Sequence, residues 1–151
     1  MKFLVLFLLV LNVITFASEI KNITDVRDSY NDKLIDILYE VLEKNHKLKE
    51  FREDISKDLT YIKDKKIKNI FINAYSLEFI SRSEVEPEED YLPINKNLLK
   101  YQKIIRESKR KDIYFYMEEL YPENDRVEGV LLTSGYVLDY IKRKIKGLKG
   151  K

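Results

Sequence analysis

The sequence predicts an all-α protein, a single helical domain of about five helices that follows a signal peptide. Five apolar residues recur at steps of seven: Leu34, Val41, Leu48, Ile55 and Ile62. Seven residues are close to two helical turns, so these side chains line one stripe of a helix. No Gly or Pro, the strongest helix interrupters, occurs between residues 18 and 86. We therefore expect a long first helix whose stripe is covered by shorter C-terminal helices.

Residues 1–17 have the features of a secretory signal peptide. Lys2 precedes an uninterrupted apolar run from Phe3 to Leu11, and Thr15 and Ala17 are the small residues of a cleavage site. The run is well short of the roughly 20 residues that span a bilayer. We expect cleavage after Ala17 and a secreted or periplasmic protein without a transmembrane span. An uncleaved anchor or a buried strand is the alternative.

The rest of the chain is predicted to form one helical domain, residues 18–146, followed by a basic tail, residues 147–151. This length is typical of a single domain with its own core. The chain contains no Cys, so no disulfide supports the fold. Helix packing must stabilise it.

The first helix should begin near Thr24, whose hydroxyl suits an N-cap, with Asp25 and Asp28 where the helix dipole favours negative charge. The apolar pattern thins around residues 44–47. The helix either continues to residue 62 or breaks near Asn45. We favour a continuous or gently bent helix, because the stripe resumes in phase at Leu48.

A second helix is predicted from about Lys66 to Ser81. Its apolar face consists of Ile67, Ile70, Phe71, Ala74 and Leu77. The segment 70–80 is also rich in β-formers, so a strand is the alternative there. Residues 84–93 follow, with five carboxylates and two prolines, and we interpret them as an acidic linker.

Three helices are predicted after this linker. Apolar spacings of three and four predict helices from about residue 98 to 110 and from 113 to 121. The last helix should begin near Asp125 and end at Gly147. Its predicted apolar face has eight members: Val127, Val130, Leu131, Ser134, Val137, Leu138, Ile141 and Ile145.

Charge is distributed unevenly along the chain. Residues 18–93 carry 13 basic and 18 acidic side chains, a net charge of −5, whereas residues 94–151 carry 14 and 8, a net charge of +6. The two halves should attract each other within the fold. The basic C-terminus could instead contact an anionic surface. The candidates for such a contact are Lys142, Arg143, Lys144 and Lys146.

The sequence offers little material for catalysis. His46 is the only His and Cys is absent, so a nucleophile has no base beside it. The four glycines form no phosphate-binding loop. Four carboxylates share one face of the first helix, where they would either bind a hard cation or form a solvated face: Asp25, Asp28, Asp32 and Asp36. We favour the solvated face, and predict no catalytic residue, cofactor or metal site.

Tyrosine is enriched, with 11 residues and no Trp. Its amphipathic ring favours interfaces, although it also lines the rims of ordinary helical cores. Five tyrosines of the C-terminal third are candidate contacts for a protein partner: Tyr114, Tyr116, Tyr121, Tyr136 and Tyr140.

These patterns predict a non-catalytic protein-binding or structural module of the cell envelope or extracellular space, whose partner is an unidentified protein. The alternative is a peripheral binder of an anionic membrane or cell-wall polymer that uses the basic C-terminus. Nucleic acid is not the expected partner. Salt should distinguish the two hypotheses, because only the cationic contact would weaken steeply at high ionic strength.

Overall fold

The computed structural model describes residues 26–83, 96–120 and 126–150, with side chains of the last helix from residue 137 onward. All regular structure in these ranges is helical, which confirms the all-α class. The elements are a first helix over residues 26–44, α2 (Leu48–Lys57), α3 (Lys65–Ser83), the 3-10 turn η2 (Lys96–Leu98), α4 (Leu99–Glu107), α5 (Lys111–Leu120) and α6 (Arg126–Lys149). The predicted signal peptide, the Thr24 cap and the acidic linker 84–93 lie outside the described residues.

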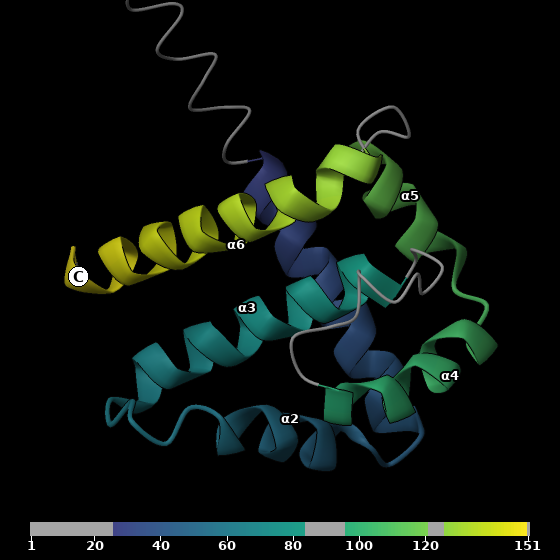
Figure 1. The fold of residues 1–151 in the computed structure, drawn as a ribbon, viewed down its shortest axis with the longest axis horizontal. Helices are drawn as coiled ribbons and strands as arrows, with labels where there is room; N and C mark the ends of the chain where they lie inside the picture. The colour runs from purple at the N-terminus through teal and green to yellow at the C-terminus, as the bar shows by residue number, and fades with distance from the viewer. Residues whose placement is uncertain (1–25, 84–95, 121–125, 151) are drawn as a thin grey trace, which may run out of the picture.

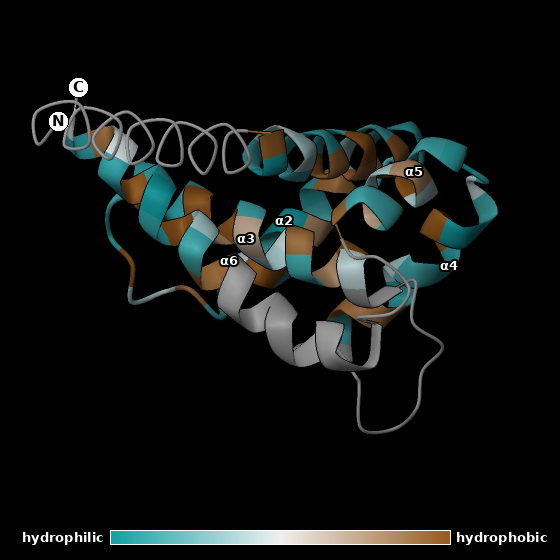
Figure 2. Ribbon diagram, turned by 90° about the horizontal axis from the view of Figure 1, so that it is seen from above, coloured by the Kyte–Doolittle hydropathy of each residue, from teal (hydrophilic) through white to brown (hydrophobic). Residues whose placement is uncertain are grey.

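Helix α3 lies between α2 and α6 and packs against both. The first helix crosses this group at a steep angle, and α4 and α5 lie at one end (Figure 1). The C-terminus of α6 lies at the opposite end of the molecule, as both views show (Figures 1 and 2). Apolar and polar residues alternate along most of the helices (Figure 2), as expected when each helix buries one face and exposes the other.

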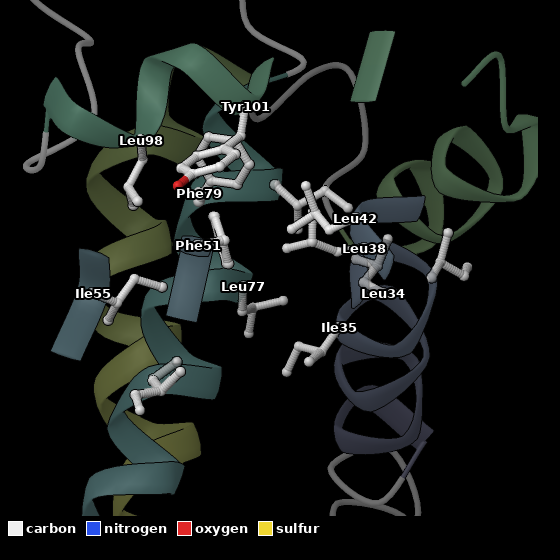
Figure 3. Packing of buried hydrophobic residues seen from close by; sticks show 14 of the residues in the cluster. Leu34, Ile35, Leu38, Leu42, Phe51, Ile55, Leu77, Phe79, Leu98 and Tyr101 are labelled. Carbon is white, nitrogen blue, oxygen red and sulfur yellow. The ribbon is translucent and has the colours of Figure 1, made fainter. Parts of the chain in front are cut away.

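The core forms where the first helix faces α2, α3 and α4 (Figure 3). Leu34, Leu38 and Leu42 are fully buried on the first helix, and Phe51 of α2 is fully buried opposite them. The Phe51 ring centroid lies 5.3 Å from that of Phe79 and 5.1 Å from that of Tyr101, the second pair edge to face. Such aromatic pairs stabilise a fold beyond their buried area, by about 0.5–1.5 kcal/mol each.

The strand alternative for residues 70–80 is wrong, since these residues belong to α3. Its second half is buried on nearly all sides, because other helices pack around it. Two serines are accommodated there through bonds to the helix itself. Ser76 Oγ donates to the Ile72 carbonyl at 2.7 Å and Ser81 Oγ to the Leu77 carbonyl at 2.8 Å. The β-formers in this segment reflect burial rather than strand structure.

The prediction of a continuous first helix through residue 62 is wrong, and the break near Asn45 is found instead. His46 has a φ of 55°, in the left-handed region. The His46 amide donates to the Glu43 carbonyl at 2.9 Å and the Lys47 amide to the Leu42 carbonyl at 2.8 Å. These bonds form a Schellman motif, which ends the helix. The stripe stays in phase because Val41 and Ile55, buried on two different helices, face the same core.

Two further expectations are corrected by α6. With 24 residues it is longer than any other described helix, so the C-terminal helices are not all short. It also continues past Gly147 to Lys149, into the predicted tail. On its predicted apolar face, Val137 and Ile141 are buried, but Leu138 is 57% exposed. Helix α3 and the first helix pack against α6, and the exposed Leu138 is not on a side that they bury.

Candidate functional site

A polar network in the interior is centred on Asp54 of α2, a carboxylate that is only 6% exposed. It accepts hydrogen bonds from Tyr101 Oη at 2.7 Å and from Lys57 Nζ at 2.8 Å. Lys100 Nζ lies 2.8 Å from the same carboxylate and 2.7 Å from that of Glu50. The network joins α2 to α4, and the sequence contains no pattern that predicts it.

These contacts shift the protonation equilibria of the network. Hydrogen bonds from Lys100, Lys57 and Tyr101 hold the pKa of Asp54 well below its usual range. Hydrogen bonds from Lys100 and then Lys47 lower the pKa of Glu50 to about 2. Burial, together with the hydrogen bond to Asp54, raises the pKa of Tyr101. Asp54 is therefore an anion at neutral pH whose donors are already supplied by the fold, which is the arrangement of a structural group rather than an acid or base.

A second polar contact joins α6 to the start of the first helix. The Arg143 guanidinium donates two hydrogen bonds to Asp28, at 2.8 and 2.7 Å. Lys144 Nζ donates to Asp32 at 2.7 Å, and Tyr140 Oη donates to the other oxygen of Asp32 at 2.9 Å. We name this contact the α6 clamp. It shows that charges of the basic and acidic halves meet inside the fold, as expected.

The clamp divides the predicted anionic-surface residues into two groups. Arg143 and Lys144 neutralise acids of this chain, so they are withdrawn from the candidate set. Lys142 and Lys146 are exposed, as is Lys149 one turn further on. Positions four and seven residues apart share a helix face, so these three lysines lie on one side of α6 together with Leu138.

The four aspartates predicted to share a helix face do not form a metal site where the structure describes them. Asp28 and Asp32 bind cations of α6 and Asp36 is exposed, while Asp25 lies outside the described ranges. No group of three or more His, Cys, Asp or Glu side chains in the described part of the chain is placed to hold a metal ion.

The five candidate tyrosines have different environments. Tyr140 is 2% exposed and belongs to the α6 clamp, so it is not available to a partner. Tyr116 is half-buried, with its ring centroid 5.3 Å from that of Tyr30. Tyr114 is 54% exposed. The side chains of Tyr121 and Tyr136 lie outside those described.

Phe115 lies next to Tyr114 on α5, and the sequence analysis did not identify it as a candidate contact. Its side chain is 54% exposed, and its ring lies edge to face against Tyr116 with the centroids 5.2 Å apart. The buried face of α5 consists of Ile113 and Leu120, with Tyr116 and Met117 packed beside them. Tyr114 and Phe115 lie outside that buried face. The apolar periodicity of the sequence could have predicted this exposure. We name Tyr114, Phe115, Glu118 and Glu119, all exposed on α5, the α5 surface.

A shallow depression of about 460 Å³ follows the outer side of α2. Its lining includes the apolar Leu48 and Ile72 and charges of both signs, from Lys49, Arg52 and Glu53 among others. Arg52 is already placed by the fold, with its guanidinium 5.1 Å from the Tyr39 ring and 2.5 Å from the Asn69 side-chain oxygen. The depression therefore presents no converging set of unused polar groups.

The chain matches no protein-family model, no curated protein and no solved structure. Within the described ranges, no helix is both long and apolar enough to cross a membrane. Function must therefore be inferred from the surfaces that the fold presents.

Proposed function

We propose that the protein is an exported, non-catalytic module that binds a protein partner through the α5 surface. The observation that carries this proposal is the pair of adjacent, half-exposed aromatic side chains, Tyr114 and Phe115, outside the buried face of α5. Large aromatic residues dominate the energetics of protein interfaces, and those gathered on a surface mark interaction sites more often than scattered ones.

The support beneath this pair favours binding. Phe115 rests against Tyr116, which packs against Tyr30 of the first helix. Ile113 and Leu120 anchor the same helix in the core. A rigid aromatic surface loses little conformational entropy when a partner covers it, which increases affinity. The α5 surface is thus better prepared for binding than an isolated aromatic on a loop, such as Tyr61, which is 69% exposed.

Export is proposed from the sequence of residues 1–17, with its apolar run and the small residues Thr15 and Ala17. Intact-mass measurement of the protein from its native cells tests it. We expect a chain that begins at Ser18. A chain that retains Lys2 would contradict export by cleavage.

Capture of partners from the native cell-envelope fraction tests the binding proposal. We expect the mature protein to retain a protein that the Tyr114→Ala/Phe115→Ala variant does not retain. The control is Tyr61→Ala, which removes a still more exposed aromatic ring elsewhere. Equal capture by both variants would contradict a role for the α5 surface.

A second candidate function is binding to an anionic membrane or cell-wall polymer. The specific observation is the row of exposed lysines on α6, Lys142, Lys146 and Lys149, beside the exposed Leu138. Each cation near an anionic membrane contributes about 1 kcal/mol, so three would support reversible association at most. Replacing the three lysines by Gln should abolish sedimentation with anionic vesicles and leave melting unchanged. Binding that survives this replacement would contradict the candidate.

A further inference from the structure

We infer that the partner of the α5 surface is a basic segment, one that presents an apolar side chain beside Lys or Arg. This inference rests on the proposed function and specifies its partner. Its basis is the juxtaposition of two exposed aromatic rings with two exposed carboxylates on one face of α5.

Helix geometry brings the rings and the carboxylates together. Glu118 lies four residues after Tyr114, and Glu119 lies four residues after Phe115. Residues four apart are neighbours on a helix surface, with about 5–6 Å between their Cβ atoms. The α5 surface is therefore apolar in its first part and anionic one turn further on. A partner that fills both parts needs an apolar group followed by a cation.

The position of the two glutamates in the helix is a second, separate observation. Carbonyl groups at a helix C-terminus carry partial negative charge, which favours Lys or Arg in the last turn and disfavours carboxylates. Helices α2, α4 and α6 each have a basic residue in the last turn, Lys57, Arg106 and Lys149 respectively, although α2 and α4 also carry Asp54 and Glu107 there. Helix α5 has no basic residue in its last turn and carries Glu118 and Glu119 there instead.

A side chain that departs from such a local rule marks the kind of position where function is expected. The field of the α5 C-terminus adds to that of the Glu119 carboxylate, so this end of the helix is more negative than the glutamate alone would make it. A cation supplied by a partner would be attracted by both. An anionic partner would be repelled by both, which separates this surface from the lysine row of α6.

Titration of the mature protein with three labelled helical peptides tests the inference by fluorescence anisotropy. The first has a Leu face beside a Lys face, the second has Glu in place of Lys, and the third has Ser in place of Leu. We expect saturable binding of the Leu/Lys peptide, and binding at least about tenfold weaker for each of the other two. Equal binding of the Leu/Glu peptide, or no binding of the Leu/Lys peptide, would overturn the inference.

Two variants and two matched controls locate the binding. Phe115→Ala and the charge reversal Glu119→Lys should each weaken the Leu/Lys peptide by about tenfold. The controls are Tyr61→Ala and Glu43→Lys, which make equivalent changes at other exposed positions, the second also in the last turn of a helix. They should change binding by less than about twofold. Equal losses in the controls would show that the peptide binds any acidic or aromatic surface, and would overturn the assignment.

The melting temperature distinguishes a binding role of Glu119 from a structural role, because the two roles predict opposite changes. The Glu119→Lys variant should melt at the same temperature as the unmodified protein or higher, because the helix dipole favours a cation in the last turn. A clearly lower melting temperature would mean that this glutamate stabilises the fold, which would overturn the inference.

The remaining outcomes separate this inference from the proposed function. If sedimentation shows that the protein self-associates and that Phe115→Ala abolishes it, the occupant is a second copy of this chain and the basic-segment inference fails. If a captured partner requires Phe115 but is retained equally by the Glu119→Lys variant, the basic-segment inference also fails, while the proposed function stands.

Discussion

The aromatic residues of α6 and α5 are used in different ways. At the α6 clamp, Tyr140 is 2% exposed and donates to Asp32. On α5, Tyr114 and Phe115 are each 54% exposed. Both regions combine rings with carboxylates. At the clamp, Arg143 and Lys144 of the same chain neutralise those carboxylates.

The comparison shows that residue type does not separate a structural tyrosine from a binding one. Burial raises the pKa of Tyr140, and the negative charge of Asp32 raises it further, so its hydroxyl is a permanent hydrogen-bond donor inside the fold. A partner surface is recognised instead by rings that lie off the buried face of their helix. Substitutions made in one region at a time should lower stability most in the core and least at the α5 surface.

The largest effect is expected where the first helix enters the core. Leu34 and Ile55 are fully buried. Leu34→Asp or Ile55→Asp would bury an unpaired carboxylate and should lower the free energy of unfolding by about 3–5 kcal/mol, enough to prevent folding of a marginally stable domain. Thermal melting followed by circular dichroism measures the effect. Unchanged melting would show that the first helix does not contribute to the core.

The α6 clamp should be the next most sensitive region. Arg143→Gln together with Lys144→Gln removes three charge-assisted hydrogen bonds and leaves the partly buried Asp28 without its cation. We expect a loss of about 2 kcal/mol. The matched control is Lys142→Gln with Lys146→Gln, which removes the same net charge from exposed positions and should change stability by less than about 0.5 kcal/mol. Similar losses in both variants would mean that total charge, not the clamp, stabilises α6.

Acid should weaken the polar network around Asp54. Its carboxyl and that of Glu50 have pKa values below their usual range, so the folded state holds these protons less tightly than the unfolded state does. Their contribution to stability is therefore complete above the unfolded values near pH 4, and it is lost as the pH falls from about 5 toward 2. Asp54→Asn should flatten this part of the profile of melting temperature against pH. An unchanged slope would contradict the role assigned to Asp54.

The smallest effect on stability is expected at the α5 surface. Tyr114→Ala and Phe115→Ala should each change the free energy of unfolding by no more than about 0.5–1 kcal/mol, since both side chains are half-exposed. The substitution Tyr101→Phe provides the comparison with a buried aromatic residue. It removes the hydroxyl that binds Asp54 and should cost about 1–2 kcal/mol. Denaturant unfolding measures all three, and a larger loss at Phe115 than at Tyr101 would reverse the comparison.

Sequence periodicity determined the helical class and most of the helix positions. Ile113, Leu120, Val137 and Ile141 are buried as predicted, because a helix that packs against neighbours must turn its apolar face toward them. The opposite charges of the two halves likewise predicted their attraction, and Asp28 and Arg143 form one of the resulting contacts.

Only the tertiary structure decided how these elements divide and which side chains remain outside. The break at His46 depends on a left-handed residue that is neither Gly nor Asn, so composition did not reveal it. The exposure of Leu138 and the burial of Tyr140 depend on how far neighbouring helices extend around α6. The bond between Tyr101 and Asp54 joins residues 47 positions apart. Periodicity describes one helix at a time, whereas the exposure of Leu138, the burial of Tyr140 and the Tyr101–Asp54 bond are set by contacts between helices.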